Sequence, residues 1–153
     1  MRTASIAAIL LAASVPGVAS AQTTPDGAKI FTRCAACHTA TGSGVPGAYP
    51  PLQSDFRTLA AKAPGRRYLA LAVIKGLSGP VTVEGKPYRG FMPAQTLDDA
   101  SVAAVLNHVG TMVAKSGPAF KAFTAAEVAA SRSDGTGLSA ADIAKLRASS
   151  GGQ

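Results

Sequence analysis

Two cysteines and a histidine lie within five consecutive residues, as Cys34, Cys37 and His38, and the chain has no other cysteine. A redox-active disulfide of the Cys-x-x-Cys type belongs in a βαβ setting, and no such alternation of strands and helices is visible in the sequence. A structural zinc site needs about four ligands, and the only further histidine, His108, lies far along the chain.

The third chemistry open to these residues is covalent attachment of haem, for which Cys-x-x-Cys-His is the known motif. On a helix, positions i and i+3 share a face, so both thiols can reach the vinyl groups of one porphyrin. His38 follows at i+4 from Cys34 and can place an imidazole nitrogen on the iron. We therefore predict one covalent haem c, attached through Cys34 and Cys37 and ligated by His38.

The composition agrees with a large non-protein group inside the fold. Aromatic residues make up 5% of the chain and tryptophan is absent, so bulky side chains for a core are scarce. Lys and Arg number 15 against 8 Asp and Glu, a formal net charge of +7. The basic residues are scattered and are not interleaved with aromatics, which argues against a nucleic-acid groove. They form either an ordinary solvated surface or a field that steers an acidic protein partner.

Haem iron with one histidine ligand has a second axial position, and Met92, Met112 and His108 are the candidates for it. Met92 lies in "RGFMPAQ", a predicted loop that Pro93 stiffens. His108 and Met112 are spaced i, i+4 on a predicted helix, where packing explains both. We predict Met92 as the ligand. A thioether favours ferrous iron and closes the metal to small ligands, which is typical of an electron carrier.

The surrounding sequence predicts mainly helices. A first helix starts at "TTPDGAKIFTR", with Thr24 as its N-cap, and residues 41–52 form a glycine- and proline-rich loop. A second helix covers "RRYLALAVIKGL", and "VTVEGKPYRG" predicts two short extended pieces that turn at Glu84-Gly85. The clearest amphipathic helix is capped by Asp98 and ends at Gly117-Pro118.

Two further short helices are predicted after Thr124 and Ser139, each with a Ser/Thr-x-x-acid start signal. We expect the first to pack on the body of the protein and the second to be a loosely attached terminal helix, with a docking element for a dehydrogenase subunit as the alternative.

The N-terminus predicts export. Arg2 precedes an apolar run, and Ala19-Ser20-Ala21 matches a signal-peptidase site. The apolar run is too short for a comfortable span of about 20 residues, although an uncleaved anchor is the alternative. We expect a signal peptide over residues 1–21, a mature chain from Gln22 without an integral membrane span, a haem domain over 22–118, and a helical extension over 119–153.

Three segments carry a resemblance: "CAACHTATGSGVPGAYPPL", "VEGKPYRGFMP" and "LDDASVAAVLNHV". They resemble class I c-type cytochromes, and more narrowly the haem domains of bacterial periplasmic dehydrogenases, including the cytochrome subunits of alcohol and sorbitol dehydrogenases and quinohaemoprotein dehydrogenases. The resemblance spans roughly residues 26–113 and extends weakly to "FTAAEVAASR". It implies an all-α class I cytochrome c fold around one covalent haem, with a short extended hairpin before the methionine loop and extra C-terminal helices.

The same resemblance assigns roles to single residues. Cys34 and Cys37 bind haem covalently, and His38 and Met92 are its axial ligands. The carbonyl of Pro50 accepts the second N–H of the proximal imidazole, with Pro46 and Pro51 as nearby alternatives. His108 departs from the pattern, because relatives often carry tyrosine on this helix.

The implied function is a periplasmic electron carrier that takes electrons from a dehydrogenase and passes them to another cytochrome or a terminal oxidase. A cytochrome subunit fixed in a dehydrogenase complex is the alternative. A haem peroxidase of the di-haem type needs a second attachment motif, and gas-binding four-helix sensors carry their motif near the C-terminus. Both therefore fit the sequence less well.

Overall fold

The computed structural model describes residues 24–152, so the predicted signal peptide and its cleavage site lie outside the described residues. Helices dominate the described chain, and one two-stranded hairpin accompanies them, as predicted. In chain order the elements are α1 (Gly27–His38), α2 (Phe56–Ala60), α3 (Ala63–Lys75), β1 (Leu77–Val83), β2 (Lys86–Met92), α4 (Asp99–His108), the π-helical turn η1 (Val109–Val113), α5 (Ala125–Asp134) and α6 (Ala140–Ser149).

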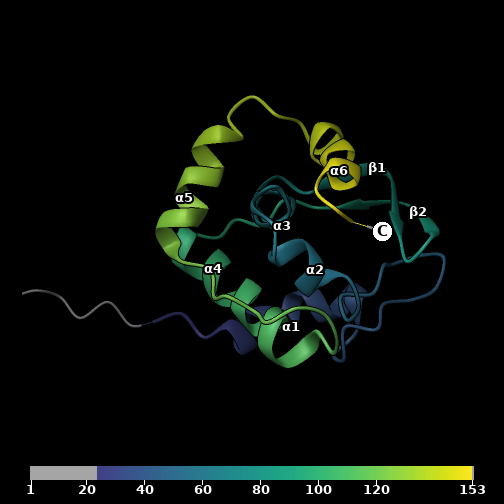
Figure 1. Ribbon diagram of the computed structural model, residues 1–153, viewed down its shortest axis with the longest axis horizontal. Helices are drawn as coiled ribbons and strands as arrows, with labels where there is room; N and C mark the ends of the chain where they lie inside the picture. Colours follow the sequence, from purple (N-terminus) through teal and green to yellow (C-terminus); the bar gives the residue numbers. More distant parts are fainter. Residues whose placement is uncertain (1–23, 153) are drawn as a thin grey trace, which may run out of the picture.

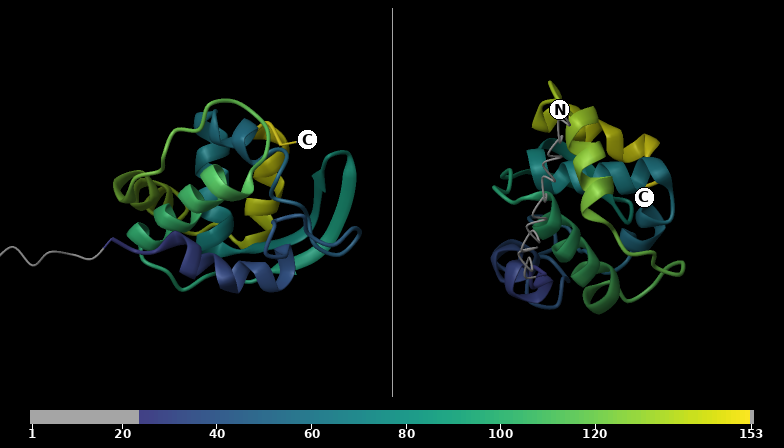
Figure 2. Two further views of the ribbon diagram at one scale, coloured as in Figure 1. Left: turned by 90° about the horizontal axis from the view of Figure 1, so that it is seen from below. Right: turned by 90° about the vertical axis from the view of Figure 1, so that its left-hand side faces the viewer.

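Helix α3 lies in the middle of the molecule, with α1 and α4 on one side of it and α6 on another (Figure 1). The hairpin projects from the helices beside the long loop that follows α1, and the two lie side by side at one edge of the molecule (Figures 1 and 2). A Cβ on Gly90 would lie 3.8 Å from the carbonyl oxygen of Ala48, which confirms that strand β2 and this loop are neighbours.

Helix α1 is capped by Asp26 and begins two residues later than a cap at Thr24 would place it. The Asp26 carboxylate accepts hydrogen bonds from the backbone N–H groups of Ala28 (2.9 Å) and Lys29 (3.1 Å). An ionised carboxylate at this position also interacts favourably with the positive end of the helix dipole, which a threonine hydroxyl cannot match. The prediction of Thr24 was therefore wrong.

Helices α1 and α4 cross in close contact at Gly27. A Cβ at this position would lie 2.2 Å from the carbonyl oxygen of Ala104. One helical turn further on, the rings of Phe31 and His108 pack with their centroids 5.2 Å apart. The glycine therefore sets the distance between the two helices that frame the N-terminal part of the site.

We expect Gly27→Ala to destabilise the protein by roughly 1–3 kcal/mol, the usual effect of overpacking. The reason is steric, because alanine forms helices more readily than glycine and would otherwise be favourable here. Chemical denaturation of the holoprotein measures the effect, with Ala28→Ser on the exposed side of the same turn as the control. A Gly27→Ala protein as stable as the control would show that the crossing is not tight.

The hairpin has the turn that the sequence predicts. Strands β1 and β2 pair antiparallel from Leu77↔Met92 to Val83↔Lys86. Glu84 and Gly85 connect them with φ angles of 53° and 71°, as a type I′ turn requires. The strands are longer than the sequence predicts and include Met92, for which the sequence predicts a loop.

Helix α4 has the predicted cap and a different end. Asp98 Oδ1 accepts a hydrogen bond from the backbone N–H of Ser101 at 2.7 Å. The α-helix stops at His108 and continues as the π-helical turn η1, which closes with a bond from Ala114 N to Val109 O (2.8 Å). At Gly110 the ring of Phe120 packs where a Cβ would sit, 2.3 Å from the nearest ring carbon. The chain thus leaves the helix before the predicted end at Gly117-Pro118.

The two C-terminal helices begin where predicted. The Thr124 hydroxyl caps α5, and Ser139 and Asp142 form a reciprocal capping box at α6. Helix α5 packs on α3 and α4, and α6 packs on α3 and β1. Ile143 on α6 is fully buried, so the expectation of a loosely attached last helix was wrong.

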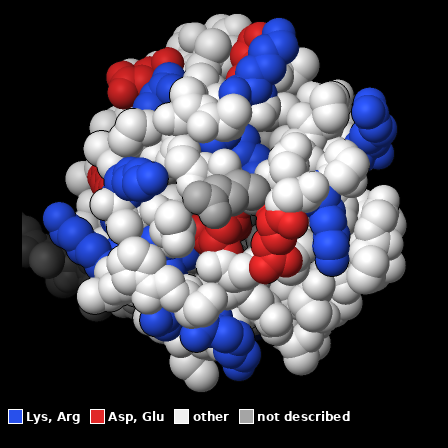
Figure 3. All heavy atoms as spheres, turned by 45° about the vertical axis from the view of Figure 1, so that its right-hand side comes forward, with Lys and Arg blue, Asp and Glu red and all other residues white. Residues whose placement is uncertain are grey.

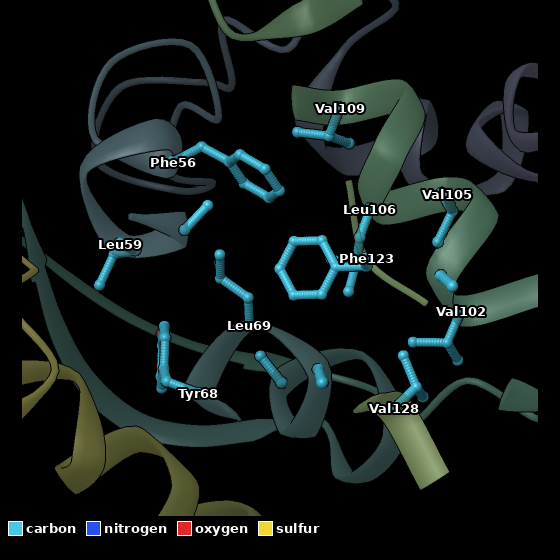
Figure 4. Close-up of a cluster of buried hydrophobic side chains, with 14 of the residues drawn as sticks. Phe56, Leu59, Tyr68, Leu69, Val102, Val105, Leu106, Val109, Phe123 and Val128 are labelled. Carbon is cyan, nitrogen blue, oxygen red and sulfur yellow. The ribbon is translucent and has the colours of Figure 1, made fainter. Parts of the chain in front are cut away.

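One hydrophobic core joins these elements. Phe56 and Leu69 face Leu106 of α4 (Figure 4). Phe123, which precedes α5, and Val128, which lies on α5, complete the cluster. Ion pairs add connections at the periphery: Arg66 on α3 pairs with Glu127, and Arg132 on α5 pairs with Asp99 at 2.7 Å. None of the helices within residues 24–152 combines the length and apolar character that crossing a bilayer requires.

Candidate functional site

A deep cavity opens between α1, the loop over residues 39–55, α3, α4 and the hairpin. Its walls are largely apolar and include Phe31, Leu52, Phe56, Leu59, Leu69, Val105 and Leu106. All five residues that the sequence nominated, Cys34, Cys37, His38, Pro50 and Met92, line it. The structure therefore brings together residues from three separate segments around a single apolar space.

Helix α1 presents Cys34, Cys37 and His38 to this cavity. The two thiols are half-buried and are not joined in a disulfide, and burial raises the pKa of the Cys34 thiol. Across residues 24–152 there is no group of three or more His, Cys, Asp or Glu side chains able to hold a metal ion. The described residues thus offer no zinc site, whereas two thiols beside an imidazole fit the attachment of one porphyrin.

The imidazole of His38 has a fixed orientation. It is 9% exposed, and its Nδ1 donates a hydrogen bond to the carbonyl oxygen of Pro50 at 2.9 Å. Of the three prolines considered, Pro50 is the one that makes this contact. Burial lowers the pKa of His38, with the Pro50 carbonyl acting in the opposite direction, so the ring is neutral at neutral pH. With Nδ1 engaged, Nε2 is the nitrogen left for a metal.

The loop after α1 is ordered by its own backbone so that Pro50 reaches His38. Gly44 has a φ of 65° and donates its N–H to His38 O at 2.9 Å. Val45 and Tyr49 then exchange two backbone hydrogen bonds of 2.8 Å. A side chain at Gly44 would collide with the backbone of Tyr49 and Pro50, at 2.3 Å and 2.7 Å. The glycines of this segment therefore allow the tight return that positions the proline carbonyl.

Met92 enters the cavity from the end of strand β2. It pairs with Leu77, which directly follows α3 and its C-terminal Gly76. Gly76 has a φ of 76°, and a Cβ there would lie 2.3 Å from Met92 O, so only glycine allows this approach. After Met92, the backbone N–H of Gln95 bonds Val73 O at 2.9 Å. The backbone around Met92 is thus held by the last turn of α3 and by the two residues that follow this helix.

The other two candidate ligands do not line the cavity. Met112 lies on η1 with 66% of its surface exposed. His108 packs its ring against Phe31 at the α1–α4 contact. The packing role that the helical spacing predicted is confirmed for His108 and is wrong for Met112, whose side chain is at the surface.

The polar residues of the cavity wall that the sequence analysis missed include Asp55, Tyr68 and Arg147. They come from the start of α2, from α3 and from α6, so no local motif unites them. The one available signal was the position of Arg147 on α6, four residues after Ile143 and therefore on the buried face of that helix.

The fold and the site together define a small helical protein that holds one haem through a Cys-x-x-Cys-His helix. The Cytochrome c family model matches residues 25–113. The chain belongs to the cytochrome c family, and it is a mono-haem electron carrier whose haem c is attached through Cys34 and Cys37.

Two relatives from Thermus thermophilus are both named cytochrome c-552. One is 47% identical over 115 residues, which is 73% of this chain and 76% of the relative. The other is 47% identical over 106 residues, which is 67% of this chain and 81% of the relative. The class I cytochrome assignment is confirmed, whereas neither relative is named as a dehydrogenase subunit.

Proposed function

We propose that this cytochrome transfers single electrons through an iron held by His38 and Met92. The observation that carries the proposal is that both side chains line one apolar cavity while Met112 and His108 do not. Haem supplies the one-electron chemistry between its ferrous and ferric states.

Each residue has a distinct task in this scheme. The Pro50 carbonyl holds the His38 ring in one orientation and increases its basicity as a ligand. Met92 contributes a soft sulfur that favours the reduced state. The apolar lining excludes water from the iron, which also favours the state of lower charge. A protein built in this way exchanges electrons and does not bind substrates at the metal.

The spectrum of the oxidised holoprotein tests the ligand pair. A methionine-to-iron charge-transfer band, together with slow binding of carbon monoxide after reduction, is the expected result. Rapid carbon monoxide binding without that band would favour a sensor or a peroxidase. The di-haem type of peroxidase is already disfavoured, because the chain has two cysteines in total and so only one attachment motif.

The donor in this proposal is a periplasmic dehydrogenase, and the acceptor is another cytochrome or a terminal oxidase. The similarity of the three quoted segments to dehydrogenase haem domains supports the donor, and the signal-like N-terminus supports the periplasm. Mass analysis of the purified protein, expected to begin at Gln22, tests export. Co-purification from the periplasmic fraction tests the donor, and a stable one-to-one complex would indicate a fixed subunit instead of a shuttle.

Electron transfer with an acidic partner is expected to slow as ionic strength rises. Exposed Arg33 lines the cavity, and Lys29, Lys86 and Arg89 are exposed on the neighbouring helix and hairpin. On the face shown in Figure 3, however, the Lys and Arg side chains are separated by uncharged surface, and acidic side chains lie near its centre. The dependence should therefore be modest.

At about 0.15 M salt the Debye length is about 8 Å, so screening acts on surface encounters of this kind. Stopped-flow measurements from low to high salt give the slope of the electron-transfer rate against ionic strength. Arg33→Gln should reduce the slope, whereas Lys121→Gln, at a residue that does not line the cavity, should leave it unchanged. If the rates of the parent protein, Arg33→Gln and Lys121→Gln do not change with salt, the basic residues are ordinary solvated surface residues.

A further inference from the structure

Two glycines face each other on the inner side of the hairpin. Gly79 of β1 pairs with Gly90 of β2 in the antiparallel register, and both line the cavity. The next cross-strand pairs of the same face, one on each side, also line it: Leu77↔Met92 and Val81↔Tyr88. Because side chains alternate between the two faces of a strand, the hairpin presents a recess between these pairs, and the floor of the recess is bare backbone.

The backbone conformation does not require a glycine at position 90. A glycine inside a strand commonly marks a bulge, a positive φ, or a place where a ligand or another segment comes very close. The strands pair residue by residue along their whole length, so the hairpin has no bulge. Gly79 has a φ of 103°, whereas Gly90 is not among the glycines with positive φ. A close approach is the reason that is left for Gly90.

No segment of residues 24–152 makes that approach. A Cβ on Gly90 would lie 3.8 Å from the carbonyl oxygen of Ala48, an ordinary contact distance, and a Cβ on Gly79 would have no described neighbour within 4 Å. Gly27 and Gly76 differ, because a Cβ there would lie 2.2 Å and 2.3 Å from a carbonyl oxygen of another segment. A pair of glycines also lacks the cross-strand side-chain contacts that stabilise a hairpin. The space in front of the pair is the cavity, so the approaching group is the one that the cavity holds.

We propose that the porphyrin packs directly on the hairpin backbone at Gly79 and Gly90, and that Gly90 is a positioning residue for the haem. A flat apolar ring system suits a recess with apolar sides and no side chain on its floor. A methyl group at position 90 would hold the porphyrin away from β2. Met92 lies two residues further along the same face, so this displacement would also move the iron away from the Met92 sulfur. The contact rests on the haem c of the family alone, and its effect on Met92 rests on the proposed function.

The first test uses the unmodified holoprotein. The ring current of a porphyrin shifts the NMR signals of protons held against it, and reduced low-spin iron is diamagnetic. The Cα protons of Gly79 and Gly90 should therefore resonate well outside the usual range of glycines in strands, with cross-peaks to porphyrin protons. Gly47 is the reference, because it does not line the cavity. Carbon monoxide keeps ferrous iron low-spin even where no methionine binds, so this readout does not depend on the sixth ligand.

The second test is the stability of the Gly90→Ala holoprotein. If the protein alone occupied this region, alanine would be neutral or stabilising, because it has room and restricts the unfolded chain. If the porphyrin packs there, Gly90→Ala should raise the unfolding equilibrium constant about tenfold through overpacking, and Gly90→Val should raise it further. Ser78→Thr is the matched control, since it adds a methyl group to the exposed outer face of the same hairpin and should leave the constant nearly unchanged.

The opposite glycine has a control of its own. Gly79→Ala would place a side chain at a positive φ, and this strain alone is destabilising. Gly47→Ala would do the same, with a φ of 78°, and its Cβ also has no described neighbour within 4 Å. Only Gly79 lines the cavity, so Gly79→Ala should destabilise the holoprotein more than Gly47→Ala does.

The absorption spectrum distinguishes a positioning role from a structural one. Gly90→Ala should weaken the methionine-to-iron band of the oxidised protein and speed the binding of carbon monoxide after reduction. Ser78→Thr should change neither. A Gly90→Ala protein that loses stability while its band and its carbon monoxide kinetics stay unchanged would show that Gly90 does not position the haem.

Two further outcomes would overturn the proposal. Unshifted Cα protons of Gly90 in the parent holoprotein would show that the porphyrin does not lie against β2. A Gly90→Ala holoprotein as stable as the parent would show that the recess has room for a side chain. If Gly90→Ala yields no holoprotein, the NMR spectrum of the parent decides. If the methionine band persists in Met92→Ala, the proposed ligand is wrong, and shifted Gly90 protons would still place the haem against the hairpin.

Discussion

Replacing Met92 by alanine is expected to lower the reduction potential while the haem stays attached. Cys34, Cys37 and His38 are untouched, so attachment and fold should survive. Loss of a sulfur ligand that favours ferrous iron should shift the reduction equilibrium by more than tenfold, that is by more than about 59 mV. Potentiometry measures this shift. The charge-transfer band of the oxidised protein should disappear, and the reduced protein should bind carbon monoxide rapidly.

Two control variants make this test specific. Met112→Ala should change the stability by no more than about 0.5 kcal/mol, because the side chain is 66% exposed. His108→Phe should keep the aromatic contact with Phe31, and neither control should alter the spectrum. Loss of the methionine band in either control, with the band retained in Met92→Ala, would show that the ligand assignment is wrong.

His38→Ala is expected to abolish stable holoprotein, and the apoprotein should be largely unfolded. Without the porphyrin, apolar walls that include Phe31, Leu59 and Leu69 would face water. Small domains that depend on a metal or cofactor are commonly unfolded without it. Far-ultraviolet circular dichroism and limited proteolysis of the variant measure the loss of structure.

Cys34→Ser and Cys37→Ser serve as graded comparisons, because each leaves one thiol and should hold haem through one thioether or not at all. Their stability should lie between those of the parent and of His38→Ala. A protease-resistant, helical apoprotein would contradict the view that haem forms the missing part of the core.

Much of the site was predictable because its signals are local. Cys34, Cys37 and His38 are contiguous, and the helical period alone places them on one face. The turn at Glu84-Gly85 and the caps at Asp98 and Ser139 depend on residues within one turn of each other. The covalent haem and the mainly helical fold followed from these signals and are confirmed.

What escaped prediction depends on contacts between distant segments. Nothing near Arg147 in the sequence indicates that Asp55 and Thr82 will surround it. The predicted end of the helix that begins at Asp99 was wrong, because the ring of Phe120 packs against Gly110. This contact comes from a later segment, and the chain leaves the helix before the Gly117-Pro118 signal is reached. Competition between two nearby polar residues decided the first cap, where Asp26 replaced Thr24.

The two-residue turn of the hairpin determines which side of the sheet the proposed ligand sulfur occupies. Side chains alternate along a strand, so a shift in pairing by one residue would send Met92 to the outer face and bring Phe91 to the inner one. The left-handed backbone at Glu84 and Gly85 fixes one pairing at the far end of β2 from Met92. The handedness of this distant turn thereby selects the face of the sheet from which the proposed ligand sulfur reaches the cavity. An insertion there is expected to alter electron transfer without changing any residue of the cavity.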